Sequence, residues 1–155
     1  MRRATMLLAA AYVSVAGCGG SSDSSTGINT GGTSSFSASL GGAAWTAAAP
    51  VSLINASGVN ISSYDASQTT NVTLTFLASA PGTYSLTFGQ NTGGIGTVSK
   101  SNGQGWSTVH PGGTGTVVVT TLTAHRAIGT FFFDAIGSSA TDVLHVTNGK
   151  FDITF

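Results

Sequence analysis

71-NVTLTFLASAPGTYSLTF-88 is the segment that decides the fold, because every second residue is apolar on both sides of Pro81-Gly82. Alternation with period two is typical of a strand that buries one face. A Pro-Gly pair is a common turn signal. We therefore expect a β-hairpin whose buried side chains are Val72, Leu74, Phe76, Tyr84, Leu86 and Phe88.

The same alternation continues on both sides of this segment. Further strands are expected over residues 36–40, 44–45, 59–62, 97–100, 106–109, 116–123, 126–135, 142–146 and 150–155. Gly41-Gly42 and Asn148-Gly149 are predicted turns between neighbouring strands. No segment has helical spacing, and the alanine-rich residues 43–49 are short and end at Pro50. The predicted fold is all-β: an antiparallel two-layer β-sandwich of about nine or ten short strands over residues 35–155.

Three consecutive phenylalanines, Phe131 to Phe133, interrupt the alternation of the strand predicted over 126–135. At least one of these rings must point away from the core. We expect a central strand covered on both faces, which would bury all three rings. The alternative is an exposed aromatic patch that binds a partner.

The N-terminal residues predict the location of the protein. Arg2 and Arg3 precede an apolar run from Ala4 to Val15, which is too short to span a membrane. Val15-Ala16-Gly17-Cys18 resembles a bacterial lipobox, which implies removal of residues 1–17 and lipidation and acylation of Cys18. The alternative is an ordinary signal peptide with an incidental cysteine. An aspartate directly after the lipidated cysteine would resemble a signal for retention in the inner membrane. Because residue 19 is glycine, we expect the protein at the outer membrane, facing either the periplasm or the cell surface.

Residues 18–34 predict a linker behind the lipidated cysteine. Residues 19–34, GGSSDSSTGINTGGTS, contain no aromatic residue and only Ile28 as a large apolar one, so they cannot build a core. A Gly/Ser-rich chain of this length spans roughly 20 to 25 Å on average. The folded domain should therefore stay close to the membrane that holds its anchor.

The charge of the chain excludes nucleic acid as a partner. After Cys18 the cations are Lys100, Arg126 and Lys150, against five aspartates and no glutamate. Affinity for nucleic acid comes from clustered Lys and Arg, and three scattered cations cannot supply it. Cys18 is the only cysteine, so neither an intramolecular disulfide nor a thiolate zinc cluster is expected.

Trp106 is the main candidate for ligand binding. It lies in the glycine-rich segment 101-SNGQGWSTVHPGGTG-115, where an aromatic face can be presented to a sugar ring or a peptide. Tyr64 and His110, with Asn102 and Gln104, would supply polar contacts. The alternative is a purely structural role, in which Trp106 and Trp45 both cover the end of the core.

The sequence gives little support for catalysis. His110, His125 and His145 could converge on a metal with Asp134 or Asp142, but no His-x-His or His-x-x-x-His pair favours it. The sequence lacks the Gly-x-Ser-x-Gly motif that presents the nucleophile of many serine hydrolases. A glycoside hydrolase needs a pair of carboxylates, which here would have to come from five aspartates. Residues 94–101, GIGTVSKS, nearly match the motif of a phosphate-binding loop, but Ser99 stands where the motif requires a glycine. We expect no enzyme and no cofactor or metal, with a small envelope hydrolase or metal-dependent enzyme as the alternative.

Five short turn and strand motifs carry a resemblance to a known family. They are Phe36-Ser37-Ala38 leading to Trp45, Gly82-Thr83-Tyr84, Gly115-Thr116-Val117, Gly129-Thr130-Phe131, and Thr147 to Phe151. Residues 35–155 thereby resemble an uncharacterised family of small secreted bacterial β-sandwich lipoproteins. The resemblance implies the fold and assigns no catalytic residue.

The expected function is therefore a lipid-anchored protein of the cell envelope that serves binding, adhesion or structural contact. Its expected partners are the membrane, through the anchor, and a glycan, peptidoglycan or another envelope protein. The terminal Phe151-Asp-Ile-Thr-Phe155 also resembles the last strand of an outer-membrane β-barrel. Most predicted strands are too short for that alternative.

Overall fold

The computed structural model describes residues 34–55, 58–87, 89 and 93–155. Predictions for residues 1–33, including Cys18 and the linker, lie outside these residues. The described chain forms eleven strands: β1 (Ser35–Leu40), β2 (Ala43–Thr46), β3 (Val51–Asn55), β4 (Gly58–Tyr64), β5 (Thr70–Phe76), β6 (Gly82–Ser85), β7 (Ile95–Lys100), β8 (Gly105–Ser107), β9 (Thr114–Leu122), β10 (Arg126–Ile136) and β11 (Val143–Thr154). Within the described ranges there is no helix long and apolar enough to cross a membrane.

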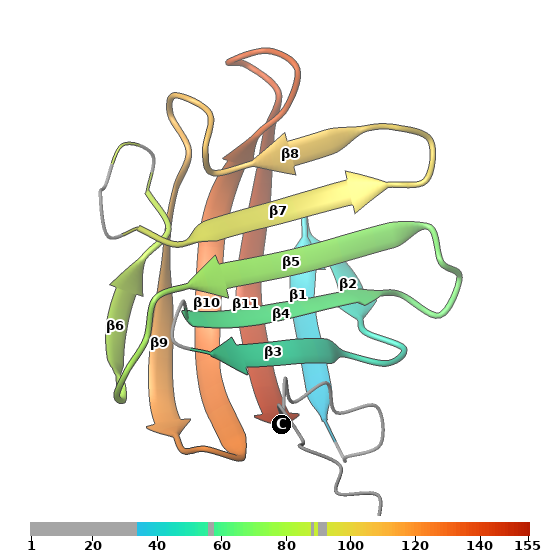
Figure 1. Ribbon diagram of the computed structural model, residues 1–155. Coiled ribbons are helices and arrows are strands. Elements are labelled where there is room, and N and C mark those ends of the chain that lie inside the picture. The colour runs from blue at the N-terminus through green and yellow to red at the C-terminus, as the bar shows by residue number, and fades with distance from the viewer. Residues whose placement is uncertain (1–33, 56–57, 88, 90–92) are drawn as a thin grey trace, which may run out of the picture.

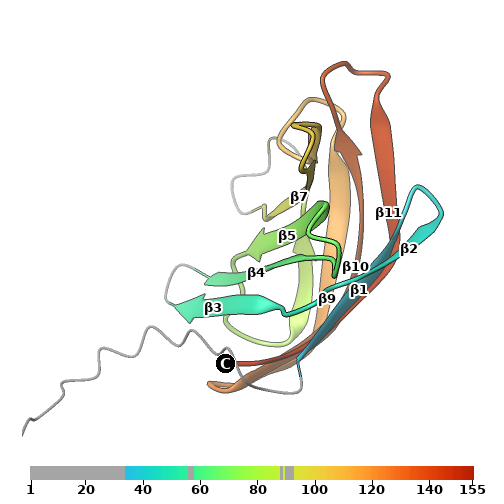
Figure 2. The same ribbon diagram turned by 90° about the vertical axis from the view of Figure 1, so that its right-hand side faces the viewer.

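All eleven strands belong to one antiparallel sheet that curls into two layers (Figure 1). The sheet runs in the order β2-β1-β11-β10-β8-β7-β5-β4-β3, and β9 pairs with both β10 and β6. The long strands β9, β10, β11 and β1 form one layer, and β3, β4, β5 and β7 cross them in the other (Figures 1 and 2). The all-β antiparallel sandwich is thus confirmed, with eleven strands in place of nine or ten.

The core lies between the two layers and follows the predicted alternation. In β5, Val72, Leu74 and Phe76 are fully buried, while the threonines between them face outward. Trp45 is also buried, and its ring packs edge-on against Phe36 with 5.2 Å between ring centroids. Trp45 therefore covers the core, as predicted for a purely structural role.

Phenylalanine rings of the long layer lie over glycines on the neighbouring strands. The directly opposed pairs are Gly129 with Phe151, Gly149 with Phe131 and Gly115 with Phe133. A Cβ at Gly129 would lie 2.5 Å from the Phe151 ring, which is closer than real contacts allow. These glycines make room for large rings in the core.

The predicted hairpin over 71–88 is wrong. β5 pairs with β4 and β7, and β6 pairs with β9 in the other layer. Pro81-Gly82 is not a tight turn, because Gly82 is already the first residue of β6 and residues 77–81 carry the chain between layers. The alternation correctly predicted that Val72, Leu74, Phe76 and Leu86 are buried. Tyr84 is only half-buried, and Phe88 lies outside the described residues. The alternation held no information on which strands pair.

The turn predicted at Asn148-Gly149 is also wrong, because β11 continues through it as a single strand. Phe131 pairs with Gly149 but Phe133 pairs with Val146, so two residues, Thr147 and Asn148, face Phe132 alone. This is a β-bulge, and Asn148 adopts a left-handed φ of 53° within it. Asn-Gly favours left-handed backbone in a bulge as well as in a turn.

The expectation that Phe131 to Phe133 are all buried is wrong as well. Phe131 and Phe133 are buried, but Phe132 is 56% exposed on the outer side of β10. The alternation of β10 is in fact continuous from Arg126 to Ala135, since Phe132 occupies an outward position. The strand β3 was not predicted, because its residues VSLIN alternate weakly. The Gly41-Gly42 turn between β1 and β2 is confirmed.

Candidate functional site

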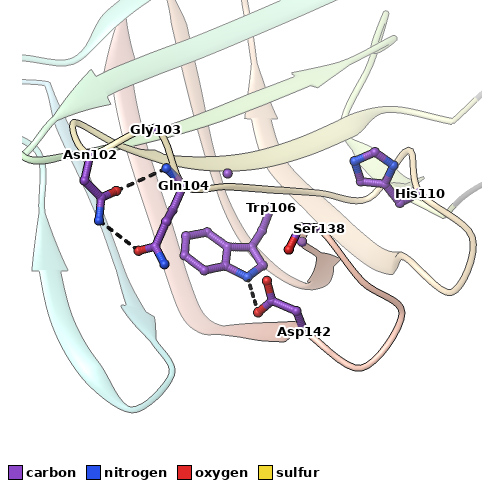
Figure 3. Close-up of a pocket in the computed structure, with 9 residues that line it drawn as sticks. Asn102, Gly103, Gln104, Trp106, His110, Ser138 and Asp142 are labelled. Carbon is purple, nitrogen blue, oxygen red and sulfur yellow. Dashed lines mark hydrogen bonds between the residues drawn. The ribbon is translucent and has the colours of Figure 1, made fainter.

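Trp106 lines an open pocket of about 530 Å³ at one end of the sandwich (Figure 3). The ring comes from β8, whose residue Ser107 pairs with Ile136 at the end of β10. Trp106 is half-buried and packs partly against the core. The pocket is lined by Asn102, Gly103, Gln104, Gly105, Trp106, His110, Gly137, Ser138 and Asp142.

The indole of Trp106 is held in place from the loop between β10 and β11. Its Nε1 group donates a hydrogen bond of 2.8 Å to Oδ1 of Asp142. Asp142 is itself fixed by the backbone, because its N–H donates to Ser139 and its carbonyl accepts from the Gly137 N–H. The ring therefore has a set orientation relative to the pocket.

Two amide side chains stand on the other side of the ring in Figure 3. Asn102 Nδ2 donates to Gln104 Oε1 at 3.1 Å, and the Gln104 N–H donates to Asn102 Oδ1 at 3.1 Å. These bonds shape the exposed turn between β7 and β8. They leave the Gln104 Nε2 group able to donate to a ligand.

A cation also approaches the ring. The ammonium of Lys100, at the end of β7, lies 5.3 Å from the centroid of the Trp106 ring. That distance is within the range of a cation–π contact. One negative group, Asp142, and one positive group, Lys100, therefore flank the indole, and neither sign of charge dominates the pocket.

His110 and Ser138 complete the lining. His110 follows β8 in a turn closed by a hydrogen bond from the Gly113 N–H to the His110 carbonyl. Figure 3 shows its ring across the pocket from Trp106, while Ser138 lies beside Asp142. The structure thus brings together Trp106 and His110 with the predicted companions Asn102 and Gln104.

Tyr64 is not part of this pocket, which corrects the prediction that it accompanies Trp106. Tyr64 pairs with Asn71, Asn71 with Ser99, and Ser99 with Gly105. Trp106 is the neighbour of Gly105 and pairs with the buried Val98, so its side chain is on the opposite face of the sheet. Tyr64 instead lines a separate hollow of about 390 Å³ with Val51 and Gln68.

A family model described as a domain of unknown function (DUF6252) matches residues 32–153, which is most of the chain. The chain belongs to the DUF6252 family. The match includes every residue that lines the Trp106 pocket. The prediction of an uncharacterised family is thereby confirmed. No curated protein and no solved structure matches the chain.

The titratable residues considered for catalysis are dispersed over the described part of the DUF6252 domain. Asp134 Oδ1 and His145 Nδ1 lie 2.7 Å apart on the exposed outer side of β10 and β11. His125 is at the other end of these strands, beside Phe155, and Asp142 holds Trp106. No group of three metal-ligating side chains occurs among the described residues.

Sequence reasoning missed Asp142 as the partner of Trp106, the lining residues Gly137 and Ser138, and the nearby cation Lys100. Asp142 was considered only as a metal ligand, because 36 residues separate it from Trp106. The amides were found since they lie within four residues of the tryptophan. A contact formed by the crossing of the two layers leaves no local signal.

Proposed function

We propose that this DUF6252 protein is a non-enzymatic, lipid-anchored protein of the cell envelope that binds a glycan in the Trp106 pocket. The observation that carries the proposal is the hydrogen bond from Trp106 to Asp142, which fixes a half-buried indole inside an open, polar hollow. A fixed aromatic ring surrounded by hydrogen-bonding groups is a suitable receptor for a ligand with one apolar face and many hydroxyls.

The chemistry around the ring favours a neutral sugar. Gln104 Nε2 and the Ser138 hydroxyl can donate to sugar hydroxyls, and the Asp142 carboxylate can accept from them. Lys100 and Asp142 offset each other in charge. A strongly charged ligand would meet a like charge at one side of the ring, whereas an uncharged pyranose would not.

The location rests on the N-terminal sequence. Val15-Ala16-Gly17-Cys18 supports lipidation of Cys18, and the Gly/Ser-rich residues behind it support a short tether. Several acyl chains hold a protein on a bilayer far more firmly than one, because each buried methylene contributes about 0.8 kcal/mol. The proposed location is the outer membrane of the cell envelope, where the domain could contact glycans and peptidoglycan.

Binding to insoluble glycans tests the proposal. The full chain is mixed with peptidoglycan sacculi or cellulose, and the bound fraction is measured after sedimentation. Trp106→Ala should reduce retention about tenfold, as expected for the loss of a stacking ring. Gln104→Ala, an exposed change that leaves the core intact, should reduce it by a smaller factor.

Tyr64→Ala is the matched control, because it removes an exposed aromatic ring from the opposite face of the sheet. Its retention should equal that of the wild type. Equal retention of all four proteins, each folded by circular dichroism, would exclude glycan binding at Trp106. That result would favour a purely structural module.

A further inference from the structure

The outer face of the long layer carries an exposed aromatic ring where the fold does not need one. Phe132 projects from the middle of β10, which is paired on both sides by β9 and β11. It is 56% exposed, and its diagonal neighbour Val118 on β9 is 36% exposed. Figure 2 shows no described element over this side of the layer. The two side chains form an apolar spot on the outer face of the sheet.

The bulge in β11 lies directly beside this spot. Thr147 and Asn148 face Phe132 in the ladder, and Asn148 takes a left-handed backbone conformation in the middle of a long strand. Bulges of this kind commonly re-aim side chains next to functional sites. Here a shallow groove of about 280 Å³ opens beside the ring, lined by Thr116, Val118, Thr130, Phe131, Phe132, Asn148, Gly149 and Lys150.

One charge in this groove has no partner. Elsewhere on the same face, Asp152 pairs with Arg126 and Asp134 with His145, at 2.7 Å in each case. Within the described ranges, Lys150 has no carboxylate at ion-pair distance. It stands opposite Thr130, two residues from Phe132 along β10. The groove therefore combines a free ammonium with an aromatic ring, hydroxyls and an amide.

From this arrangement we propose a second binding surface, centred on Phe132 and Lys150, for an acidic polysaccharide of the uronic acid type. The ring would stack on the C–H face of a sugar, and Lys150 would pair with its carboxylate. Thr116, Thr130 and Asn148 would bond its hydroxyls. The surface is independent of the Trp106 pocket and of the function proposed there.

Other partners fit this face less well. An extended peptide usually adds to a free strand edge, and both edges of β10 are occupied. One ring and one cation give too little area and charge to hold a bilayer. A polysaccharide needs only side chains along an open groove, which is what this face offers.

Polygalacturonate tests the proposal, with its methyl-esterified form as the matched neutral ligand. Calorimetry on the full chain should show tighter binding of the acidic polymer, weakening as salt rises. Lys150→Gln should abolish the preference for the acidic form. Phe132→Thr, which keeps a residue suited to strands, should weaken binding of the acidic polymer about five- to tenfold.

Lys100→Gln and Trp106→Ala are the controls, since they remove the other lysine and the ring of the other pocket. Both should bind polygalacturonate as the wild type does. The proposal is overturned if folded wild type does not bind the polymer, if Lys150→Gln and Phe132→Thr bind it unchanged, or if Trp106→Ala abolishes binding. Phe132-dependent binding to vesicles of equal parts phosphatidylcholine and phosphatidylglycerol, without polymer binding, would assign the surface to a membrane instead.

Discussion

Gly137 controls how closely Asp142 can approach the indole of Trp106. A Cβ at this position would lie 2.0 Å from Asp142 Oδ2 and 2.8 Å from Trp106 Nε1. Gly137→Ala should therefore displace Asp142 and break its bond to the ring. We expect a loss of about 1–3 kcal/mol in the free energy of unfolding, typical of overpacking. Urea denaturation measures this loss, and tryptophan fluorescence reports the change around the indole.

Gly105→Ala is the control for this prediction, because Gly105 lines the same pocket and has room for a methyl group. The nearest atom to its Cβ would be the Val98 carbonyl oxygen at 3.9 Å. Its unfolding free energy should remain within about 0.5 kcal/mol of the wild type. If both variants behave alike, the close approach at Gly137 does not position Asp142.

The Arg126–Asp152 pair makes stability depend on pH. Hydrogen bonds from Arg126, aided by its charge, hold the pKa of the Asp152 carboxyl below its usual value. The stabilising contribution is therefore present above the ordinary carboxyl pKa of about 3.9 and is lost as pH falls through the lowered value. Both side chains are substantially exposed, so the effect is small and sensitive to salt.

Asp152→Asn tests this dependence. The variant should be slightly less stable than the wild type at about pH 7, and the difference should shrink towards about pH 2, as the Asp152 carboxyl becomes protonated and therefore neutral like asparagine. Urea unfolding at the two pH values measures it. A difference of the same size at both would show that the charge of Asp152 is not responsible.

The residues of the candidate site could be predicted only where they are neighbours in sequence. Trp106, Asn102, Gln104 and His110 lie in one glycine-rich segment, so their grouping was visible. Tyr64 was placed with them wrongly, because the face on which a side chain projects depends on strand register. No single-residue pattern contains that register.

At the level of elements, the bulge of β11 depends on the left-handed conformation of Asn148. Valine is strained in this conformation, whereas glycine adopts it freely. Asn148→Val should cost about 1–2 kcal/mol of unfolding free energy, and Asn148→Gly should change it by only a few tenths. Thermal and urea unfolding of both variants measure the difference. Equal stability would mean that the bulge tolerates ordinary backbone at this position.

Strand positions were largely predictable, but strand pairing was not. Alternation along residues 71–76 gave the buried face correctly, because burial on one face is a local property. Along residues 126–135 the three consecutive phenylalanines hid the alternation that the strand in fact has. The pairing of β6 with β9 joins residues more than 30 positions apart and depends on the crossing of the layers. The turn signals at Pro81-Gly82 and Asn148-Gly149 were misleading, since their backbone preferences also suit a crossover and a bulge.

At the level of the whole molecule, the proposed anchor predicts a change in location. Cys18→Ala removes the only thiol that can be lipidated. The variant should shift from the membrane fraction to the soluble fraction, while the wild type stays with the membrane. Cell fractionation measures the distribution, and mass spectrometry of the wild type should find a lipidated N-terminal cysteine. Ser22→Ala, in the linker, is the control and should remain membrane-bound. A wild-type chain with a free thiol would contradict the anchor.

The overall class was predictable, since period-two alternation recurs along most of residues 36–155 and no segment has helical spacing. The curling of one sheet into two layers was not. It depends on β8, which pairs with both β7 and β10 through only three residues. A strand of three residues is too short for alternation to predict that it connects the two layers.

The length of β11 has a mechanical consequence. The strand begins at Val143, beside the Trp106 pocket, and ends at Thr154, whose N–H donates to Ser34 where the described chain begins. A tether at Ser34 and a ligand at Trp106 would thus pull from opposite ends of the domain, roughly 35–40 Å apart along the strand. Such tension would load the β1–β11 ladder in shear, so that its hydrogen bonds share the force. We therefore expect the domain to resist unfolding under force when it is tethered at one end and bound to a ligand at the other.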